Sequence, residues 1–197
     1  VLIAAQGVSE GVVTIIDGSE RVCLPLVDGK AEYAPEHPIC WSPENPHLYE
    51  FYVESGEDRV DSYFALRSLS VELQGGYPRL CLNGKPYFFH GLLDQGYFSD
   101  GIYTPADYAA YEYDILKMKK LGFNMLRKHI KVEPEQFYYL CDRLGMVVFQ
   151  DMVNNGKYSF FRDTALPTAG VQRLWDGWLH LNKRSRRAFE EGMKKTV

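Results

Sequence analysis

The sequence predicts an all-β region followed by an α/β region with a parallel sheet. Residues 1 to about 68 consist of short β-branched and aromatic runs closed by turn dipeptides, which is typical of part of an antiparallel sandwich. After Gly75-Gly76 the pattern changes to strand, helix, strand, helix, strand with short connections. That order indicates right-handed crossovers between parallel strands. We therefore expect two domains, residues 1–74 and 75–197.

Composition narrows the classes of function. The chain has 197 residues and a formal net charge of −4, which gives no electrostatic case for nucleic acid as a partner. Its apolar runs are too short to span a membrane. The four cysteines are widely spaced, which favours a reducing compartment such as the cytoplasm. The compartment itself stays open, because residues 1–5 look like an internal strand rather than a true N-terminus.

The all-β region is expected to contain strands at residues 12–16, 22–26, 48–54 and 59–66. Two proline-rich loops, residues 34–38 and 42–46, cannot join a central ladder. Trp41 lies between them, and we expect it to be a packing anchor rather than a ligand platform. The stretch 69–74 is the expected domain boundary. Beyond it, Asn83-Gly84 between two apolar runs predicts a hairpin with a type I′ turn.

Helix-capping residues mark where the helices of the α/β region begin and end. Thr104 followed by Pro105 predicts a helix start, and the apolar spacing carries that helix to Gly122. A strand at residues 123–126 follows. Pro134 opens a second helix, Gly145 ends it, and residues 146–149 form the third strand.

The last part of the chain gives a weaker pattern. Residues 154–170 are expected to be a long loop, and loops of this length are usually functional. Residues 171–195 are a candidate long helix that carries four large apolar residues, Leu174, Trp175, Trp178 and Leu181. The basic run 183–187 is expected to be a solvated face balanced by Glu190 and Glu191.

Polar side chains follow each of the three expected parallel strands. The candidate substrate-binding residues are Arg127, His129, Asp94, Gln95, Asp151 and Asn154. The carboxyl ends of parallel strands form one edge, and these donors and acceptors suit a polyhydroxylated ligand. The alternative is that Arg127 and Asp151 form an ion pair that braces the sheet, with His129 as a structural histidine. Glycine-rich phosphate loops and zinc-protease motifs are absent from the sequence, so we expect no cofactor.

Several short motifs occur in the order in which one known family carries them. They are Trp41-Ser42-Pro43, Asn45-Pro46-x-Leu48-Tyr49, Asp61, Arg67, Leu82-Asn83-Gly84-Lys85-Pro86, Asp114-Ile115-x-x-Met118-Lys119, Gly122-Phe123-Asn124-x-x-Arg127, Cys141-Asp142-Arg143-Leu144-Gly145-Met146 and Gln150-Asp151. On these residues the chain resembles glycoside hydrolase family two, the family of β-galactosidases, β-glucuronidases and β-mannosidases.

The resemblance implies the end of an immunoglobulin-like β-sandwich joined to an incomplete (β/α)₈ TIM barrel, its first three βα units. It also implies a retaining enzyme that acts on terminal β-linked sugars, with carbohydrate as its partner and a homo-oligomer of the full-length protein left open. In the family, the segment Asn124-x-x-Arg127 would line the sugar site. The third strand ends in Gln150-Asp151-Met152-Val153 rather than the metal-binding sequence of some members, so no metal is expected.

Retaining hydrolysis needs two carboxyl groups about 5 Å apart. The family places its acid/base in an Asn-Glu pair, and this sequence contains no such dipeptide. We therefore expect no catalytic residue in this segment and no hydrolysis by the segment alone. The alternatives are a pseudoenzyme or a non-catalytic carbohydrate-binding module, the latter supported by Trp41, Tyr49, Tyr52 and Tyr63.

Overall fold

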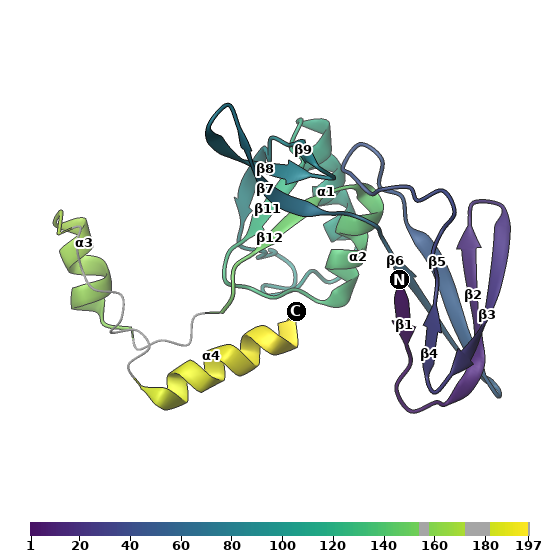
Figure 1. Cartoon of the computed structure of the whole chain (residues 1–197). Coiled ribbons are helices and arrows are strands. Elements are labelled where there is room, and N and C mark those ends of the chain that lie inside the picture. The colour runs from purple at the N-terminus through teal and green to yellow at the C-terminus, as the bar shows by residue number, and fades with distance from the viewer. Residues whose placement is uncertain (154–157, 172–181, 197) are drawn as a thin grey trace.

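The computed structural model describes residues 1–153, 158–171 and 182–196. The antiparallel first part of the chain lies beside a mixed α/β part, and the last helices extend away from both (Figure 1). Asn154 and the four apolar residues of the expected long helix (Leu174, Trp175, Trp178 and Leu181) lie outside the described residues.

Six antiparallel strands form the first sheet, in the order β1-β4-β3-β2-β5-β6. Their bounds are β1 (Leu2–Ala4), β2 (Glu10–Asp17), β3 (Glu20–Val27), β4 (Lys30–Glu32), β5 (Tyr49–Ser55) and β6 (Asp58–Phe64). The four expected strands and the strand at the N-terminus are confirmed. The sheet surrounds one core, made of Ile3, Val13, Ile15, Leu26, Ala31, Tyr33 and Tyr49. Ile3 of the edge strand β1 belongs to this core, and the partly buried Phe64 of the other edge strand, β6, packs against it, so the sheet is curled rather than flat.

A small second sheet contains β7 (Leu69–Gln74), β8 (Tyr77–Leu82) and β9 (Lys85–Pro86). Asn83 and Gly84 have φ angles of 52° and 72°, which confirms the hairpin and its turn of two positive φ angles. Strand β7 pairs with β8 across Gly75-Gly76. This hairpin therefore spans the expected boundary at residue 74.

The third sheet consists of three parallel strands, β10 (Gly91–Asp94), β11 (Met125–Lys128) and β12 (Val147–Gln150). Helices α1 (Ala109–Lys120) and α2 (Glu135–Leu144) connect them, which confirms the alternating order read from the sequence. The helices and the sheet share a core of Tyr111, Ile115, Leu126, Phe137, Leu140, Cys141 and Met146.

The expected start of the first helix was wrong. Helix α1 begins at Ala109, and Asp107 rather than Thr104 accepts a backbone N–H there, from Ala109 at 2.8 Å. The reason is that Ala106 donates its N–H to the carboxylate of Asp100, which ties this stretch to the preceding loop. The predicted helix ends are confirmed, because Gly122 and Gly145 have φ angles of 90° and 76°.

Strand β11 begins two residues later than expected. Phe123 still donates its N–H to the carbonyl of Met118, so it belongs to the end of α1. The ladder with β10 and β12 starts at Met125 and continues to Lys128. This shift places Lys128 inside the strand rather than after it.

The antiparallel and parallel parts meet at Asp142 of α2. The indole of Trp41 donates to the Asp142 carbonyl at 2.7 Å, and the Asp142 carboxylate accepts hydrogen bonds from Tyr63 and Arg67 at 3.1 and 3.0 Å. Burial of the Tyr63 hydroxyl, together with the Asp142 charge, raises the pKa of Tyr63. Trp41 is fully buried, which confirms it as a packing anchor.

Part of the expected loop at residues 154–170 is helical instead, in a π-helix η1 (Phe161–Ala165) and α3 (Leu166–Thr168). Asp163 accepts the backbone N–H of Ser159 at 2.6 Å, which starts this turn. Helix α4 (Lys183–Thr196) confirms the last part of the expected helix 171–195, whereas Val171 and Asn182 are not helical, and Arg187 pairs with Glu191 on the exposed surface of α4.

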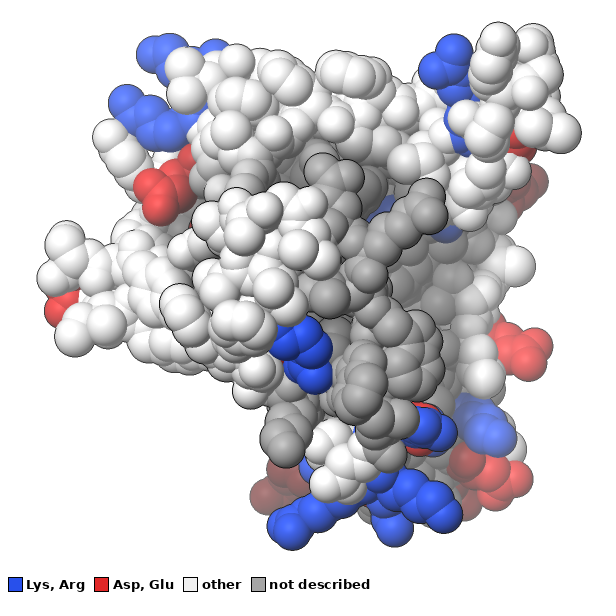
Figure 2. Space-filling view, turned by 90° about the vertical axis from the view of Figure 1, so that its left-hand side faces the viewer, with Lys and Arg blue, Asp and Glu red and all other residues white. Residues whose placement is uncertain are grey.

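The side of the molecule that α3 and α4 occupy carries Lys and Arg side chains at its lower end, where α4 lies (Figure 2). No helix within residues 1–153, 158–171 and 182–196 is both long enough and apolar enough to cross a membrane.

Candidate functional site

The carboxyl ends of the three parallel strands lie side by side. Asp94, Lys128 and Gln150 occupy matching positions in β10, β11 and β12. Two backbone bonds continue this pairing, from His129 N–H to the Asp94 carbonyl at 2.9 Å and from Asp151 N–H to the Lys128 carbonyl at 3.0 Å. The strand ends therefore form one edge, as the sequence predicted.

Alternation along the strands divides the polar residues between two faces. One face, which we call the helix face, carries Leu126 in the core with α1 and α2, and so also Lys128 two positions on. The other carries Leu93, Arg127 and Phe149 in register. We call it the open face, because Leu93 and Arg127 are exposed.

On the open face Arg127 holds Asp151 with two hydrogen bonds, of 3.1 and 2.9 Å. The bonds from Arg127 to Asp151 raise the pKa of the guanidinium. The side chains are 56% and 24% exposed, so the pair remains in contact with solvent. This is the ion pair that the sequence offered as an alternative. It fixes the plane of the guanidinium and leaves Nη1 without a partner among the described residues.

Gln95 and His129 form a second contact on the same edge. The Gln95 Nε2 atom lies 3.3 Å from Nδ1 of His129. The backbone of His129 is fixed by its bond to Asp94, so both side chains extend from anchored strand ends. Together with Arg127 they present hydrogen-bonding groups to one region.

Three charged residues are buried on the helix face, and a fourth, Asp94, lies beside them and is 23% exposed. Lys128 has no exposed surface, and its ammonium contacts Asp94 at 2.8 Å and also Glu133. Lys131 lies 2.9 Å from the same Glu133 carboxylate. We call Asp94, Lys128, Lys131 and Glu133 the charge cluster. Two cations face two anions, which is the condition under which buried charges are tolerated.

Tyr111 completes the surroundings of Glu133. Its hydroxyl donates to Oε2 of Glu133 at 2.8 Å. Burial, followed by this bond to Glu133, raises the pKa of Tyr111, so the phenol stays protonated and acts as a donor. Nearby, burial and the Asp94 charge raise the pKa of Asp114.

The charge cluster lies against the backbone at Gly96. Asp94 accepts the Gly96 N–H at 2.8 Å, and Lys131 donates to the Gly96 carbonyl. Gly96 has a φ of +63°, and a Cβ there would collide with Glu133 and both lysine ammonium groups. Only glycine fits this position for both reasons.

The predicted site residues lie on different faces of the parallel sheet. Gln95, Arg127, His129 and Asp151 gather on or beside the open face, whereas the Asp94 carboxylate lies on the helix face with Lys128. Asn154 lies outside the described residues.

Asn124 is at the opposite end of β11 from His129. Its side chain donates to the Phe88 carbonyl at 3.0 Å and accepts the His90 N–H at 2.9 Å. It therefore joins the start of β10 to the hairpin before it and does not share the edge with Arg127.

Sequence reasoning missed Lys131 and Glu133. A signal for the charge cluster was present, because Lys128 follows the apolar Leu126 by two positions and so lies on the core side of a strand. The expected strand ended at Leu126, which hid this alternation.

The aromatic residues that supported a binding module are engaged in packing. Trp41 and Tyr49 are fully buried, and the Arg59 guanidinium covers the Tyr52 ring at 3.8 Å. Tyr63 donates its hydroxyl to Asp142. Trp41 and Tyr49 therefore cannot contact a ligand, whereas Tyr52 and Tyr63 line a cleft between the first sheet and α2.

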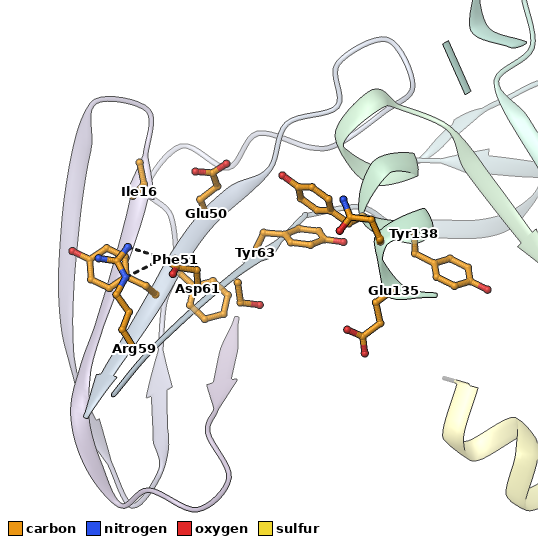
Figure 3. Close-up of a pocket in the computed structure, with 12 residues that line it drawn as sticks. Ile16, Glu50, Phe51, Arg59, Asp61, Tyr63, Glu135 and Tyr138 are labelled. Carbon is orange, nitrogen blue, oxygen red and sulfur yellow. Dashed lines mark hydrogen bonds and ion pairs between the residues drawn. The ribbon is translucent and has the colours of Figure 1, made fainter. Parts of the chain in front are cut away.

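A cleft of about 760 Å³ separates β5 and β6 from the start of α2 (Figure 3). Glu50, Asp61 and Tyr63 extend toward it from the sheet, and Glu135 faces it from the helix. Arg59 already pairs with Asp61 at 2.6 Å. None of the lining residues comes from the three parallel strands, so this cleft is separate from the candidate site.

In the part of the chain that the structure describes, no three His, Cys, Asp or Glu side chains come together in a way that could hold a metal ion.

No family model matches the chain. It is 34% identical over 201 residues to the β-galactosidase of Aeromonas hydrophila subsp. hydrophila, which covers 87% of the chain and 19% of that protein. It is 29% identical over 149 residues to the β-galactosidase of Oenococcus oeni, with 70% and 14% covered. The chain thus spans less than a fifth of the length of these two curated relatives.

Solved structures give the same result. The β-glucuronidase of Faecalibacterium prausnitzii superimposes with a TM-score of 0.62 at 26% identity, covering 75% of the chain and 24% of that protein. β-Glucuronidase 3 of Bacteroides uniformis has a TM-score of 0.65 at 20% identity, covering 75% and 19%, and shows the fold alone. The chain therefore resembles part of the family-two glycoside hydrolases, as the motifs indicated, and its relatives are glycosidases.

Proposed function

We propose that this chain is a segment of a family-two glycoside hydrolase that cleaves terminal β-linked sugars with retention of configuration. The observation that carries the proposal is the row of hydrogen-bonding groups from Gln95, His129 and Arg127 at the carboxyl edge of three parallel strands. This is the edge at which α/β barrels bind their substrates. The glycosidase relatives supply the class of substrate, a carbohydrate.

The proposed architecture has two domains. The curled sheet would be the end of an immunoglobulin-like sandwich, and the α/β part would be the first three βα units of a TIM barrel. Our expected division was 1–74 and 75–197. Because β7 pairs with β8, we now place the division before Leu69. Strands β10 and β12 have free edges among the described residues, and a closed barrel would pair both with further strands.

The proposed roles follow from the two faces of the sheet. Arg127 would donate from Nη1 to sugar hydroxyls while Asp151 fixes its plane. Gln95 and His129 would bind as a pair. Asp94 would support them from the helix face. We keep Asn154 as a proposed ligand because of its position in the sequence after β12.

We place the catalytic carboxylates in parts of the protein outside this segment. The two acids nearest to the open edge are both engaged, Asp151 with two guanidinium nitrogens and Asp94 with Lys128 and the Gly96 N–H. A retaining mechanism needs two carboxyl groups about 5 Å apart that can donate a proton and attack carbon. The segment alone should therefore not hydrolyse glycosides.

The test uses the longest product of the native gene, assayed with aryl β-D-galactoside and aryl β-D-glucuronide. We expect turnover, with the β-anomer formed first in the proton NMR spectrum. Arg127→Met should lower kcat/KM by about 10- to 100-fold, the loss of a charged hydrogen bond to substrate. Arg59→Met is the matched control, because Arg59 is also half exposed and also pairs with an aspartate.

Three results would count against the proposal. The first is a gene product that hydrolyses no aryl β-glycoside, which would favour a pseudoenzyme. The second is a kcat/KM for Arg127→Met equal to that for Arg59→Met, which would remove Arg127 from the site. Finally, robust turnover by the 197-residue chain that Asp151→Asn abolishes would place catalysis inside this segment.

A further inference from the structure

The loop after β10 is folded tightly on itself. Phe98 and Ile102 exchange two backbone hydrogen bonds, of 3.0 and 2.9 Å, which closes a small hairpin around Asp100-Gly101. Phe98 packs its ring against Tyr111, beside the charge cluster. We call residues 95–103 the β10 loop. It extends from the same strand end as Gln95.

Lys131 ties the two ends of the β10 loop together. Its ammonium donates to the carbonyls of Gly96 and Tyr103, at the start and end of the loop. The same ammonium lies 4.5 Å from the centre of the Tyr103 ring and 5.7 Å from that of Tyr97. Lys131 is buried, so water does not compete for these contacts.

The loop places an aromatic side chain beside the candidate site. Tyr97 is 65% exposed and lines a cavity of about 370 Å³ together with Leu93 and Gln95. The cavity lies between α1 and the strand end, at the edge of β10 that is free among the described residues, because the rest of its lining comes mostly from the helix side, including Asp94, Tyr111 and Asp114. Tyr97 follows Gln95 by two positions and carries this cavity toward the candidate site. A large aromatic surface next to a few polar groups is the usual composition of a small-molecule site.

We propose that Tyr97 is a further substrate-contacting residue, and that Lys131 is the positioning residue that holds Tyr97 and Gln95 in place through the β10 loop. The inference rests on the proposed function for its ligand, a sugar. The anchoring itself rests on this chain's own contacts, so the two can be tested apart.

A simpler role for Lys131 is to balance the charge of Glu133. Two variants of the native gene product separate the roles. Lys131→Met removes both the charge and the loop anchor, and it leaves the charge cluster with an excess anion. Lys131→Met with Glu133→Gln restores neutrality, since Lys128 still faces Asp94, but it does not restore the anchor.

The rate of amide hydrogen exchange at Phe98 and Ile102 measures how firmly Lys131 holds the β10 loop. We expect exchange at both amides to become about 10-fold faster or more in the single and the double variant. The free energy of unfolding in urea should fall in the single variant and recover in the double variant. If the double variant restores slow exchange as well, Lys131 merely balances charge and the anchoring role is overturned.

Activity of the native gene product tests the contact with substrate. Tyr97→Ala should raise KM by about 5- to 10-fold with little change in kcat, the loss expected for one aromatic contact. The matched control is Tyr113→Ala, because Tyr113 is 60% exposed on α1. The neutral double variant should shift KM in the same direction, and adding Tyr97→Ala to it should have little further effect.

The outcomes are distinguishable. An active gene product in which Tyr97→Ala matches Tyr113→Ala overturns this inference and leaves the proposed function standing. A gene product without glycosidase activity overturns the proposed function and the sugar contact together, while the exchange experiment still decides the role of Lys131.

Discussion

The two faces of the three-stranded parallel sheet use similar charged residues in opposite ways. On the helix face, Lys128, Lys131 and Glu133 are buried, and Asp94, which is 23% exposed, pairs with Lys128 from the edge. On the open face, Arg127 and Asp151 pair in contact with solvent. Residues 127 and 128 are neighbours in the chain, yet alternation along the strand places them in different environments.

This difference teaches how the edge can combine stability with binding. A buried charge that loses its partner is costly, whereas a solvent-exposed ion pair contributes little to stability. The charged residues of the helix face therefore keep their partners, because losing one would cost much free energy. The open face keeps hydrogen-bonding groups that can change partners at small cost, which a ligand site requires.

The largest expected effect is that of Lys128→Met. It leaves the buried Glu133 and the partly buried Asp94 facing one cation, and we expect a loss of about 3–5 kcal/mol in the free energy of unfolding, measured by urea titration. Arg127→Met, the change at the neighbouring residue on the open face, should cost far less. Equal losses for the two variants would remove the distinction between the faces.

Gly96→Ala should have the next largest effect, a loss of about 3 kcal/mol. A Cβ at this positive φ is strained and would also displace Glu133 and Lys128. Gly56→Ala is the control, because Gly56 has the same φ of +63° but nothing within 4 Å of its added Cβ. The excess loss at Gly96 measures how tightly the charge cluster is packed. An equal loss at both glycines would mean that the cluster tolerates displacement.

Tyr111→Phe should cost about 2 kcal/mol at neutral pH, because it removes a hydrogen bond to a buried carboxylate. The folded-state pKa of Tyr111 is raised, so its contribution is full below about pH 10 and is lost as the pH rises further. The fall in stability between about pH 9 and pH 11 should therefore be smaller in Tyr111→Phe than in the parent chain. Tyr113→Phe should leave this fall unchanged, and a Tyr111→Phe variant with the parent's full pH dependence would contradict the assignment.

The smallest expected effect is that of Asp151→Asn in the 197-residue chain. The pair with Arg127 is in contact with solvent, so the melting temperature should fall by less than about 4 °C, as calorimetry can measure. A fall as large as that of Lys128→Met would show that the open-face pair is a brace for the sheet, the alternative that the sequence left open.

Features set by neighbouring residues could be predicted. The turn at Asn83-Gly84, the helix ends at Gly122 and Gly145, and the parallel order of the strands follow from local conformational preference and short connections. The start of α1 could not be predicted in this way. Asp100 binds the backbone at Ala106 and so delays the helix, a contact that no local preference contains.

The sequence by itself determined the class of fold and the three strand ends at which polar residues collect. It did so because hydrophobic periodicity and turn chemistry are local properties. Only the tertiary structure decided that Asp94 joins Lys128 on the helix face while Gln95 joins His129 on the open face. It also brought Lys131 to the loop at Gly96, 35 residues earlier in the chain. Both depend on strand register and burial, which come from packing across the sheet rather than from residues near each other in the chain.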